Sequence, residues 1–194
     1  GLKDASPRDL DKLLGAEAVH QGVAVEVAPL EPLDLDALGD ARLVVVLDQV
    51  TDPHNVGAIL RSAVAFGADA LVTTGRHAPT ETGVLAKSAS GALEHIAMIE
   101  VPNLATALTD LRDMGYTCVG LDSEGTTSIE DGMQGDRIAL VLGAEGKGLR
   151  RLTRDRCDVV ARLDMPGAIK SLNVSNAAVL SLYLAHRHLG TPTA

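Results

Sequence analysis

Aromatic residues are nearly absent from this chain of 194 residues, which contains no tryptophan, one phenylalanine and two tyrosines. The core must therefore be built from leucine, valine, isoleucine and alanine, and an apolar content of 46% is enough to supply it. Cysteine is also scarce, because Cys118 and Cys157 are the only two. Two cysteines are too few for a disulfide framework, so we expect reduced thiols and a cytoplasmic protein.

Long apolar runs and an excess of positive charge are missing as well. No apolar stretch approaches the roughly 20 residues of a membrane span, so we expect no membrane partner. The net charge of −9 argues against a strong nonspecific hold on nucleic acid by the whole surface. A local basic patch exists, although such a cluster is commonly just a solvated helix face. It lies in "GKGLRRLTRDR" and comprises Lys147, Arg150, Arg151, Arg154 and Arg156.

The chain changes character near residue 40. Residues 1–40 read as a helix, a short strand over 23–27 and a linker with two prolines, and they are too few to form a domain alone. From Arg42 onward, continuous β-branched runs such as "RLVVVLDQV" alternate with helical patterns such as "NVGAILRSAVAFGA". This alternation predicts an α/β fold with a mostly parallel sheet flanked by helices. The last helix is expected from Ser171 to about His188.

Ligands of parallel sheets bind beyond the carboxyl ends of the strands, and two loops there are distinctive. In "LDQVTDPHNVGAILRSA", Asp52-Pro53 makes a turn and Asn55 is the expected N-cap of a helix whose first amides could receive an anion. In "LVLGAEGKGL", three glycines flank Glu145 and permit close backbone approach to a ligand. Its spacing fits neither a Walker A loop nor a clean dinucleotide fingerprint. A plain capped helix and a plain tight turn remain alternatives for these two loops.

A third loop is "MPGAIKSLNVSNAAVLSLYLAH", in which Ser171, Asn173 and Ser175 alternate with apolar residues. A helix cap would explain one of these polar side chains but not the alternating set. The pattern favours a loop whose backbone wraps a ligand while its polar side chains point inward. The sequence holds no CxxC pair, HExxH helix or GxSxG elbow, so we expect no metal and no hydrolase nucleophile of that type.

Taken in order, these three loops resemble motifs 1, 2 and 3 of the SpoU (TrmH) family of RNA ribose 2′-O-methyltransferases, in the SPOUT superfamily. The resemblance covers roughly residues 42–190. The stretch "AVHQGVAVEV" resembles the end of the L30e-like RNA-binding domain of the 23S rRNA guanosine-2′-O-methyltransferase subgroup. On this basis residues 1–40 are a remnant of that domain plus a linker, and residues 41–194 are the methyltransferase domain. Most of the substrate-binding domain would then lie outside this chain, which we expect to bind cofactor but to methylate RNA poorly.

The resemblance implies a deep trefoil knot in the C-terminal segment, with S-adenosyl-L-methionine as the cofactor bound in it. It also implies a homodimer with each site near the subunit interface, and an RNA substrate, above all a guanosine of 23S rRNA. A tRNA target and a catalytically idle RNA-binding or dimerisation module of the same fold are the alternatives. An NAD-linked enzyme is disfavoured, because Thr73-Thr74 stands where such an enzyme needs an acid to hold a ribose.

The resemblance also assigns roles to individual residues. The implied catalytic residues are Asn55, Arg61, Glu145, Ser171 and Asn173. The implied cofactor-binding residues are Leu121, Gly143, Glu145, Gly146, Leu163, Met165, Ser171 and Leu172. The implied RNA-binding residues are Arg61, Lys147, Arg150 and Arg151.

The chemistry implied for Arg61 has two versions. The reaction moves a methyl from a sulfonium to a ribose hydroxyl, so the protein must align the reacting atoms and take up a proton. The family proposal makes Arg61 the base. Because a guanidinium stays protonated in proteins, Arg61 is physically easier to understand as a phosphate clamp or as a group that orients the hydroxyl.

The sequence departs from the family pattern beside the cofactor loop. Asp164 stands where the family often has proline, and an acid there would alter affinity for a positively charged cofactor.

Overall fold

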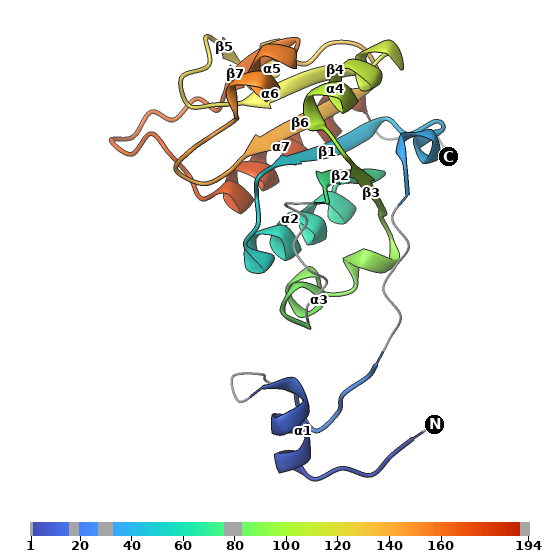
Figure 1. Cartoon of the computed structure of the whole chain (residues 1–194). Helices are drawn as coiled ribbons and strands as arrows, with labels where there is room; N and C mark the ends of the chain where they lie inside the picture. The colour runs from blue at the N-terminus through green and yellow to red at the C-terminus, as the bar shows by residue number, and fades with distance from the viewer. Residues whose placement is uncertain (1, 16–19, 27–32, 76–82, 191–194) are drawn as a thin grey trace. The chain divides into compact units, whose positions relative to one another are not determined.

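The computed structural model describes residues 2–15, 20–26, 33–75 and 83–190 (Figure 1). The chain divides into two compact units, Gly1–Glu31 and Pro32–Ala194. This division lies earlier than the boundary expected at residue 40. The reason is local: the 3-10 turn η1 (Leu35–Leu38) buries Leu38 in the core of the second unit, and Leu33 pairs with Ile99 of that unit's sheet.

The described part of the first unit contains helix α1 (Pro7–Leu14). A capping box starts it, because the Ser6 hydroxyl accepts from the Asp9 N–H while the Asp9 carboxylate accepts from the Ser6 N–H and hydroxyl. These hydrogen bonds from Ser6 lower the pKa of Asp9. The strand expected over 23–27 is not present at 23–26, and Val27 lies outside the described residues. A strand needs a partner, and the described part of this unit offers none.

The second unit is built on a parallel sheet of seven strands in the order β3-β2-β1-β6-β4-β7-β5. Adjacent strands pair in parallel throughout, and the C-terminal residues of β1 and β6 are in register. The predicted α/β fold with a parallel sheet is therefore confirmed. The strands are β1 (Leu43–Asp48), β2 (Ala70–Thr74), β3 (Ala97–Val101), β4 (Thr117–Leu121), β5 (Thr127–Ser128), β6 (Ile138–Gly143) and β7 (Val159–Arg162).

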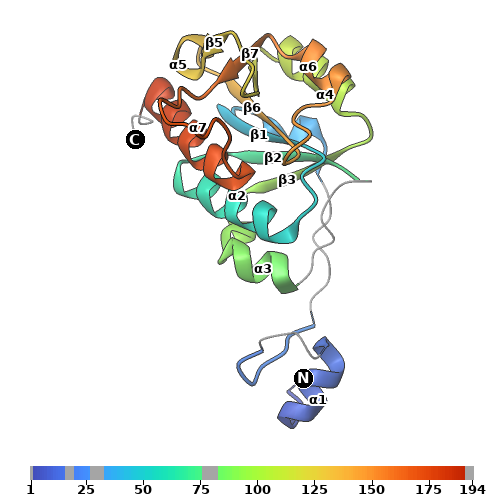
Figure 2. The same cartoon turned by 90° about the vertical axis from the view of Figure 1, so that its left-hand side faces the viewer.

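Different helices cover the two faces of the sheet (Figure 2). Successive side chains of β1 point to opposite faces. Leu43, Val45 and Leu47 pack in a core with α2 and α7, whereas Val44 and Val46 pack in a core with α4. No helix in the described ranges is both long and apolar enough to cross a membrane. The helices are α2 (Pro53–Ala65), α3 (Gly83–Ala89), α4 (Leu104–Asp113), α5 (Ile129–Gly132), α6 (Arg151–Arg156) and α7 (Val174–Leu189), with a 3-10 turn η2 (Ala92–Glu94).

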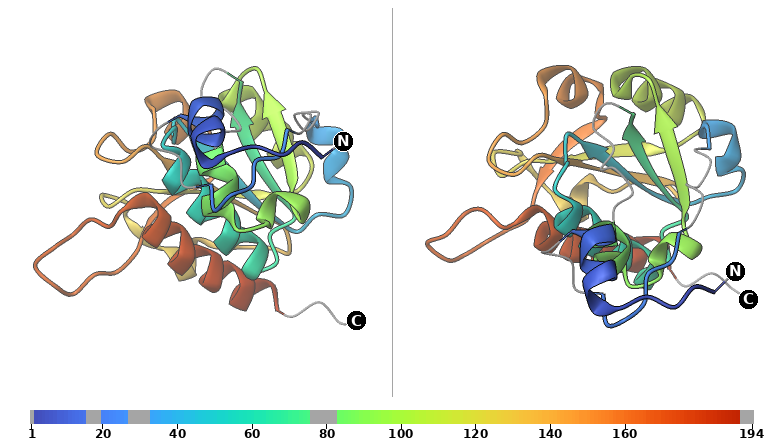
Figure 3. Two further views of the ribbon diagram at one scale, coloured as in Figure 1. Left: turned by 90° about the horizontal axis from the view of Figure 1, so that it is seen from below. Right: turned by 60° about the horizontal axis from the view of Figure 1, so that its bottom comes forward.

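The last helix starts later than expected. Helix α7 begins at Val174 rather than at Ser171, because Asn173 is its N-cap and accepts the N–H of Ser175 at 2.9 Å. Residues 163–173 before it form a largely exposed loop that extends away from the sheet (Figure 3). The three polar residues of the third motif therefore divide between a loop, a cap and the first turn of a helix.

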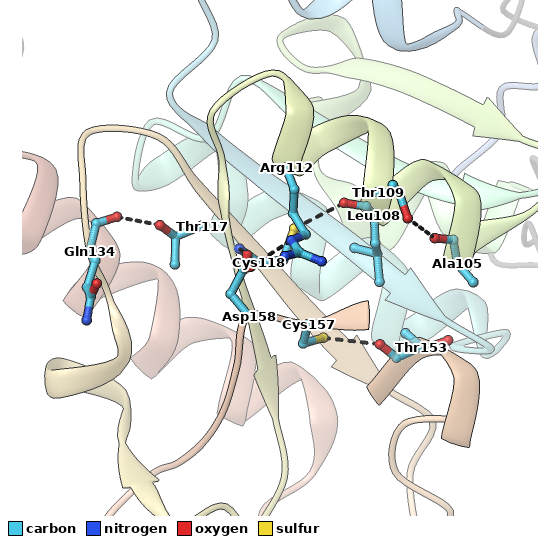
Figure 4. A network of polar contacts seen from close by, with 10 residues as sticks. All are labelled: Ala105, Leu108, Thr109, Arg112, Thr117, Cys118, Gln134, Thr153, Cys157 and Asp158. Carbon is cyan, nitrogen blue, oxygen red and sulfur yellow. Dashed lines mark hydrogen bonds and ion pairs between the residues drawn. The ribbon is translucent and has the colours of Figure 1, made fainter. Parts of the chain in front are cut away.

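Both cysteines lie in a polar network that joins β4, α4 and the start of β7 (Figure 4). Asp158 binds the Arg112 guanidinium at 2.7 Å and accepts the N–H of Cys118 at 2.8 Å. The thiol of Cys118 donates to the carbonyl of Leu108, and the thiol of Cys157 donates to the carbonyl of Thr153. Burial raises the pKa of the Cys118 thiol, and also that of Cys157, to about 12.

We expect both thiols to resist alkylation in the folded protein at roughly pH 8, because only the thiolate reacts. The folded protein also keeps these protons to higher pH than the unfolded chain does. The contribution of the two protonated thiols to the free energy of unfolding is therefore complete below pH 9.0. It is lost as the pH rises from there to about 12. Mass spectrometry after iodoacetamide treatment, with and without denaturant, and urea midpoints across that range measure both effects. Rapid labelling of either cysteine in the native protein would contradict this prediction.

Candidate active site

The three distinctive loops meet where the strand order reverses. Strands β2 and β3 lie on one side of β1, and strands β4, β7 and β5 lie beyond β6. The carboxyl ends of strands at such a switch point form the usual ligand crevice of an open α/β sheet. A cavity of about 240 Å³ is found there, over the ends of β6, β4 and β7. This volume is just below the usual range of small-molecule sites, roughly 300–1,000 Å³.

All eight predicted cofactor-binding residues line this cavity. They come from the end of β4, from the glycine loop after β6, and from the loop that links β7 to α7. The structure therefore brings them together, while their contact with a cofactor stays a prediction. They are Leu121, Gly143, Glu145, Gly146, Leu163, Met165, Ser171 and Leu172.

The glycine loop folds back tightly over the end of β6. The N–H of Gly148 donates to the carbonyl of Ala144 at 2.8 Å, which closes the loop. A Cβ atom on Gly143 would lie 2.2 Å from the carbonyl carbon of Gly148 and 2.4 Å from its oxygen. Gly146 and Gly148 both have positive φ, which side chains rarely tolerate. The three glycines of the motif thus serve one compact turn that exposes backbone to the cavity.

An ion pair with a buried carboxylate anchors the far end of the glycine loop. Asp48, the last residue of β1, is 1% exposed. Its carboxylate accepts the Arg150 N–H at 2.8 Å and the Arg150 Nε at 2.6 Å. Arg150 was predicted to bind RNA, and the structure directs its guanidinium to Asp48 while leaving the side chain 42% exposed. Asp48 was not among the predicted site residues, although a lone acid closing the apolar run "LVVVLD" was a usable signal.

Asn173 connects the three motifs. Its Nδ2 donates to Oδ1 of Asn55 at 3.1 Å and to Oε2 of Glu145 at 3.3 Å. Its Oδ1 accepts the N–H of Ser175 and, at 2.6 Å, the Ser175 hydroxyl. These bonds to Ser175 fix the amide orientation, so the Nδ2 group must point toward the other two motifs. Ser175 was not among the predicted site residues.

Asn55 is free for this contact because it is not the N-cap of α2, as had been expected. Asp52 is the cap, and its carboxylate accepts the N–H of His54 at 3.0 Å. Pro53 takes the first helical position, where its missing N–H costs nothing. Asn55 therefore lies in the first turn, with its side chain directed to Asn173.

The remaining predicted residues are dispersed. Ser171 lines the cavity, but Arg61 does not, and Arg61 is exposed on α2 with no hydrogen bond or ion pair to any residue that the structure describes. Lys147 is exposed in the glycine loop. Arg151 is exposed as well, with Asp155 at 3.8 Å as a loose partner. Arg61 thus takes no part in the described hydrogen bonds that join Asn173 to Asn55 and Glu145.

Comparisons with known proteins bear on this site. The sequence profile of the SpoU rRNA Methylase family matches residues 42–183. A protein of Staphylococcus haemolyticus (strain JCSC1435) described as "Putative TrmH family tRNA/rRNA methyltransferase" is 38% identical over 185 residues, which cover 92% of this chain and 74% of that protein.

Solved structures are similar over most of the second unit. The SpoU methyltransferase AviRb from Streptomyces viridochromogenes, in complex with AdoMet, matches with a TM-score of 0.72 and 31% identity, over 82% of this chain and 66% of that one. The A. aeolicus TrmH/SpoU tRNA modifying enzyme matches with a TM-score of 0.65 and 27% identity, over 76% of this chain and 75% of that one. This chain therefore spans just under two thirds of the length of AviRb.

Replacing Gly143 with alanine tests the close turn. We expect Gly143→Ala to destabilise the protein by about 2 kcal/mol or more, because the new methyl group meets backbone atoms that cannot move aside cheaply. Gly167→Ala is the matched control, since Gly167 has open space around its Cβ position and no positive φ. Thermal and urea unfolding of both variants measure the difference. Equal stability of the two variants would show that the loop does not close over Gly143.

Proposed function

This chain belongs to the SpoU rRNA Methylase family, and we propose that it transfers the methyl group of S-adenosylmethionine to a ribose 2′-hydroxyl of RNA. The observation that carries the proposal is the contact of Asn173 with Asn55 and Glu145 beside the cavity. It joins the three motifs at the switch point of the sheet, where such a fold binds ligands.

The cavity suits this cofactor. Its walls combine apolar side chains with exposed backbone of the glycine loop, as an adenosine group requires. Leu121, Leu163 and Leu172 provide apolar contacts, and Gly143 permits close approach of the backbone. When bound, the cofactor supplies a methyl group already activated by its sulfonium. The protein itself then has to hold, orient and deprotonate the hydroxyl.

We assign those tasks to the Asn173 cluster. Both hydrogens of the Asn173 amide are used within the protein, so the amide fixes the Asn55 and Glu145 side chains relative to the cavity. Within the described residues, no donor reaches the second carboxylate oxygen of Glu145, Oε1. This oxygen can accept the hydrogen bond of a ribose hydroxyl, orient it toward the methyl group and take up its proton as the new oxygen–carbon bond forms and the carbon–sulfur bond breaks. Ser171, exposed at the cavity wall, is a second hydroxyl contact.

We further propose that Arg61 reaches the site of a partner subunit in a homodimer. In its own chain Arg61 lies outside the cavity, on the exposed side of α2. Helix α7 packs beside α2 and exposes Val179, Leu180 and Tyr183, which offer an apolar surface for a second copy. Because its guanidinium stays charged, Arg61 of the partner subunit would hold an RNA phosphate and not act as the base.

The C-terminal knot is part of the same proposal. Strand β7 lies between β4 and β5, which are consecutive in the chain, so the connection between them must cross β7. Gly125 of that connection lies so close that its Cβ would be 2.6 Å from the carbonyl carbon of Ala161, and its carbonyl accepts from Arg162 at 3.0 Å. A loop closed over β7 in this way, with α7 leaving beyond it, supports a threaded chain.

For the RNA we propose a guanosine of 23S rRNA in the cytoplasm, and residues 1–40 as the end of an L30e-like RNA-binding domain plus its linker. The support is the likeness of "AVHQGVAVEV" to that domain. A tRNA target is the second candidate, because the A. aeolicus relative is a tRNA modifying enzyme. Transfer of labelled methyl groups to purified 23S rRNA and tRNA distinguishes the two.

Asn173→Ala separates binding from transfer. We expect the wild-type chain to bind S-adenosylmethionine at one site in a calorimetric titration, and the variant to bind it within about threefold as tightly, because Asn173 does not line the cavity. Transfer to RNA should fall by about 10²-fold or more, since the oriented cluster is lost. Asn176 is an exposed polar residue of the same helix, so Asn176→Ala is the control and should leave cofactor affinity and methyl transfer unchanged. Absence of cofactor binding by the wild-type chain would refute the proposed function. Unchanged methyl transfer by Asn173→Ala would refute the role assigned to the Asn173 cluster.

Subunit complementation tests the position of Arg61. Arg61→Ala and Asn173→Ala should each be inactive as homodimers. After mixing and reassociation, a heterodimer has one intact site if Arg61 acts on the partner, so activity should return to about a quarter of the wild-type value. If Arg61 acts within its own chain, both sites of the heterodimer are defective and the mixture stays inactive.

A further inference from the structure

Asp122 lines the cavity but belongs to none of the three motifs. It follows β4 directly, and its side chain is 15% exposed. Its Oδ2 accepts from Arg154 of α6 at 2.6 Å, and its Oδ1 accepts the N–H of Glu124 at 2.9 Å. Its own N–H donates to the carbonyl of Ala161 in β7 at 2.9 Å. Two hydrogen bonds to the carboxylate and one from the backbone therefore hold Asp122 at one place on the cavity wall.

The cavity contains two carboxylates with different electrostatic surroundings. Asp122 has its charge compensated by the guanidinium of Arg154. Glu145 is hydrogen-bonded to the neutral amide of Asn173 and has no cationic partner among the described residues. A cation entering the cavity is therefore attracted more strongly to Glu145 than to Asp122, whose charge Arg154 already compensates. Neutral hydroxyl groups are the donors that a compensated carboxylate still accepts well.

The two acids follow different strands of the cavity wall. Asp122 follows β4, which lies on the far side of β6 from β1, while Glu145 follows β6 and contacts Asn173. A cofactor whose ribose lies at Asp122 can direct its sulfonium across Gly143 toward Glu145 and the Asn173 cluster. The reverse orientation would place the sulfonium beside Arg154, away from the polar cluster.

We propose that Asp122 accepts hydrogen bonds from the ribose hydroxyls of S-adenosylmethionine, with Arg154 as the positioning residue that holds its carboxylate. A carboxylate has about four lone-pair positions, of which Arg154 and Glu124 use two, so two remain for the two hydroxyls. An acid after a parallel strand performs the same task for ribose in dinucleotide sites. This inference rests on the proposed function, because it names a contact of the same cofactor.

Calorimetric titration of wild type and Asp122→Asn with four ligands tests the contact. The ligands are S-adenosylmethionine, S-adenosylhomocysteine, 5′-methylthioadenosine, and an S-adenosylhomocysteine analogue that lacks both ribose hydroxyls. We expect Asp122→Asn to bind the first three at least about tenfold more weakly, because a charge-assisted bond is lost. The analogue without hydroxyls should bind the two proteins equally.

Each other outcome is decisive. If methylthioadenosine, which has no amino acid group, binds both proteins equally while S-adenosylmethionine binds the variant weakly, Asp122 holds the amino group and the proposal is wrong. Unchanged binding of every ligand overturns it as well. If wild type binds none of the four, the proposed function itself fails, and the inference fails with it.

Two further variants guard against a purely structural effect. Arg154→Gln keeps the carboxylate but loses its support, so the preference for hydroxylated over hydroxyl-free ligand should fall without disappearing. Asp164→Asn removes a different carboxylate, which pairs with Arg162 in the loop after β7, and should leave that preference unchanged. If Asp122→Asn does not fold, Arg154→Gln alone decides. An unchanged ratio of its affinities for hydroxylated and hydroxyl-free ligand would then contradict the proposal.

Discussion

The candidate site depends on one buried charge. Asp48 ends an apolar strand in the middle of the sheet, where a carboxylate without a partner is costly. Among the described residues, Arg150 is the only cation that pairs with Asp48, through its Nε. The backbone N–H of Arg150 donates to the same carboxylate. Breaking such a pair costs on the order of 3–5 kcal/mol, and the partial exposure of Arg150 puts this one at the lower end. The chain between β6 and Arg150 must therefore fold back to the end of β1, which is why it needs glycines at 143, 146 and 148.

The fold and the position of the site could be predicted from local patterns. Apolar runs and helical stripes report burial, and burial decides which face a strand or helix turns to the core. The order of strands could not be predicted this way, because β7 pairs between β4 and β5 through contacts far apart in the sequence. The same limit applied to Asp48 and Asp122. Neither acid was among the predicted site residues, and its part in an ion pair appears only when an arginine more than thirty residues away binds it.

Residues near element ends were predicted less well, for a related reason. Asn55 and Asp52 are both good caps, and the proline at 53 decides between them, because it fits the first helical position that follows Asp52. At the other end of the chain, the last helix was expected to start at Ser171. In the structure Asn173 starts it: the side-chain oxygen Oδ1 caps α7, while the side-chain nitrogen Nδ2 donates to Asn55 and Glu145. One side chain thus ends the loop, starts the helix and joins the motifs.

The basic segment after the glycine loop shows how an acidic protein can still receive RNA. Its cations divide into two sets with opposite tasks. Arg150 and Arg154 are bound to the acids Asp48 and Asp122, so they stabilise the site instead of offering charge to a ligand. Lys147 and Arg151 remain exposed, in the glycine loop and at the start of α6. In a chain of net charge −9, long-range attraction cannot bring a polyanion to the surface. Only exposed cations within roughly 8 Å of the reacting ribose, one Debye length, can then attract the RNA. This favours binding of a specific RNA over nonspecific binding.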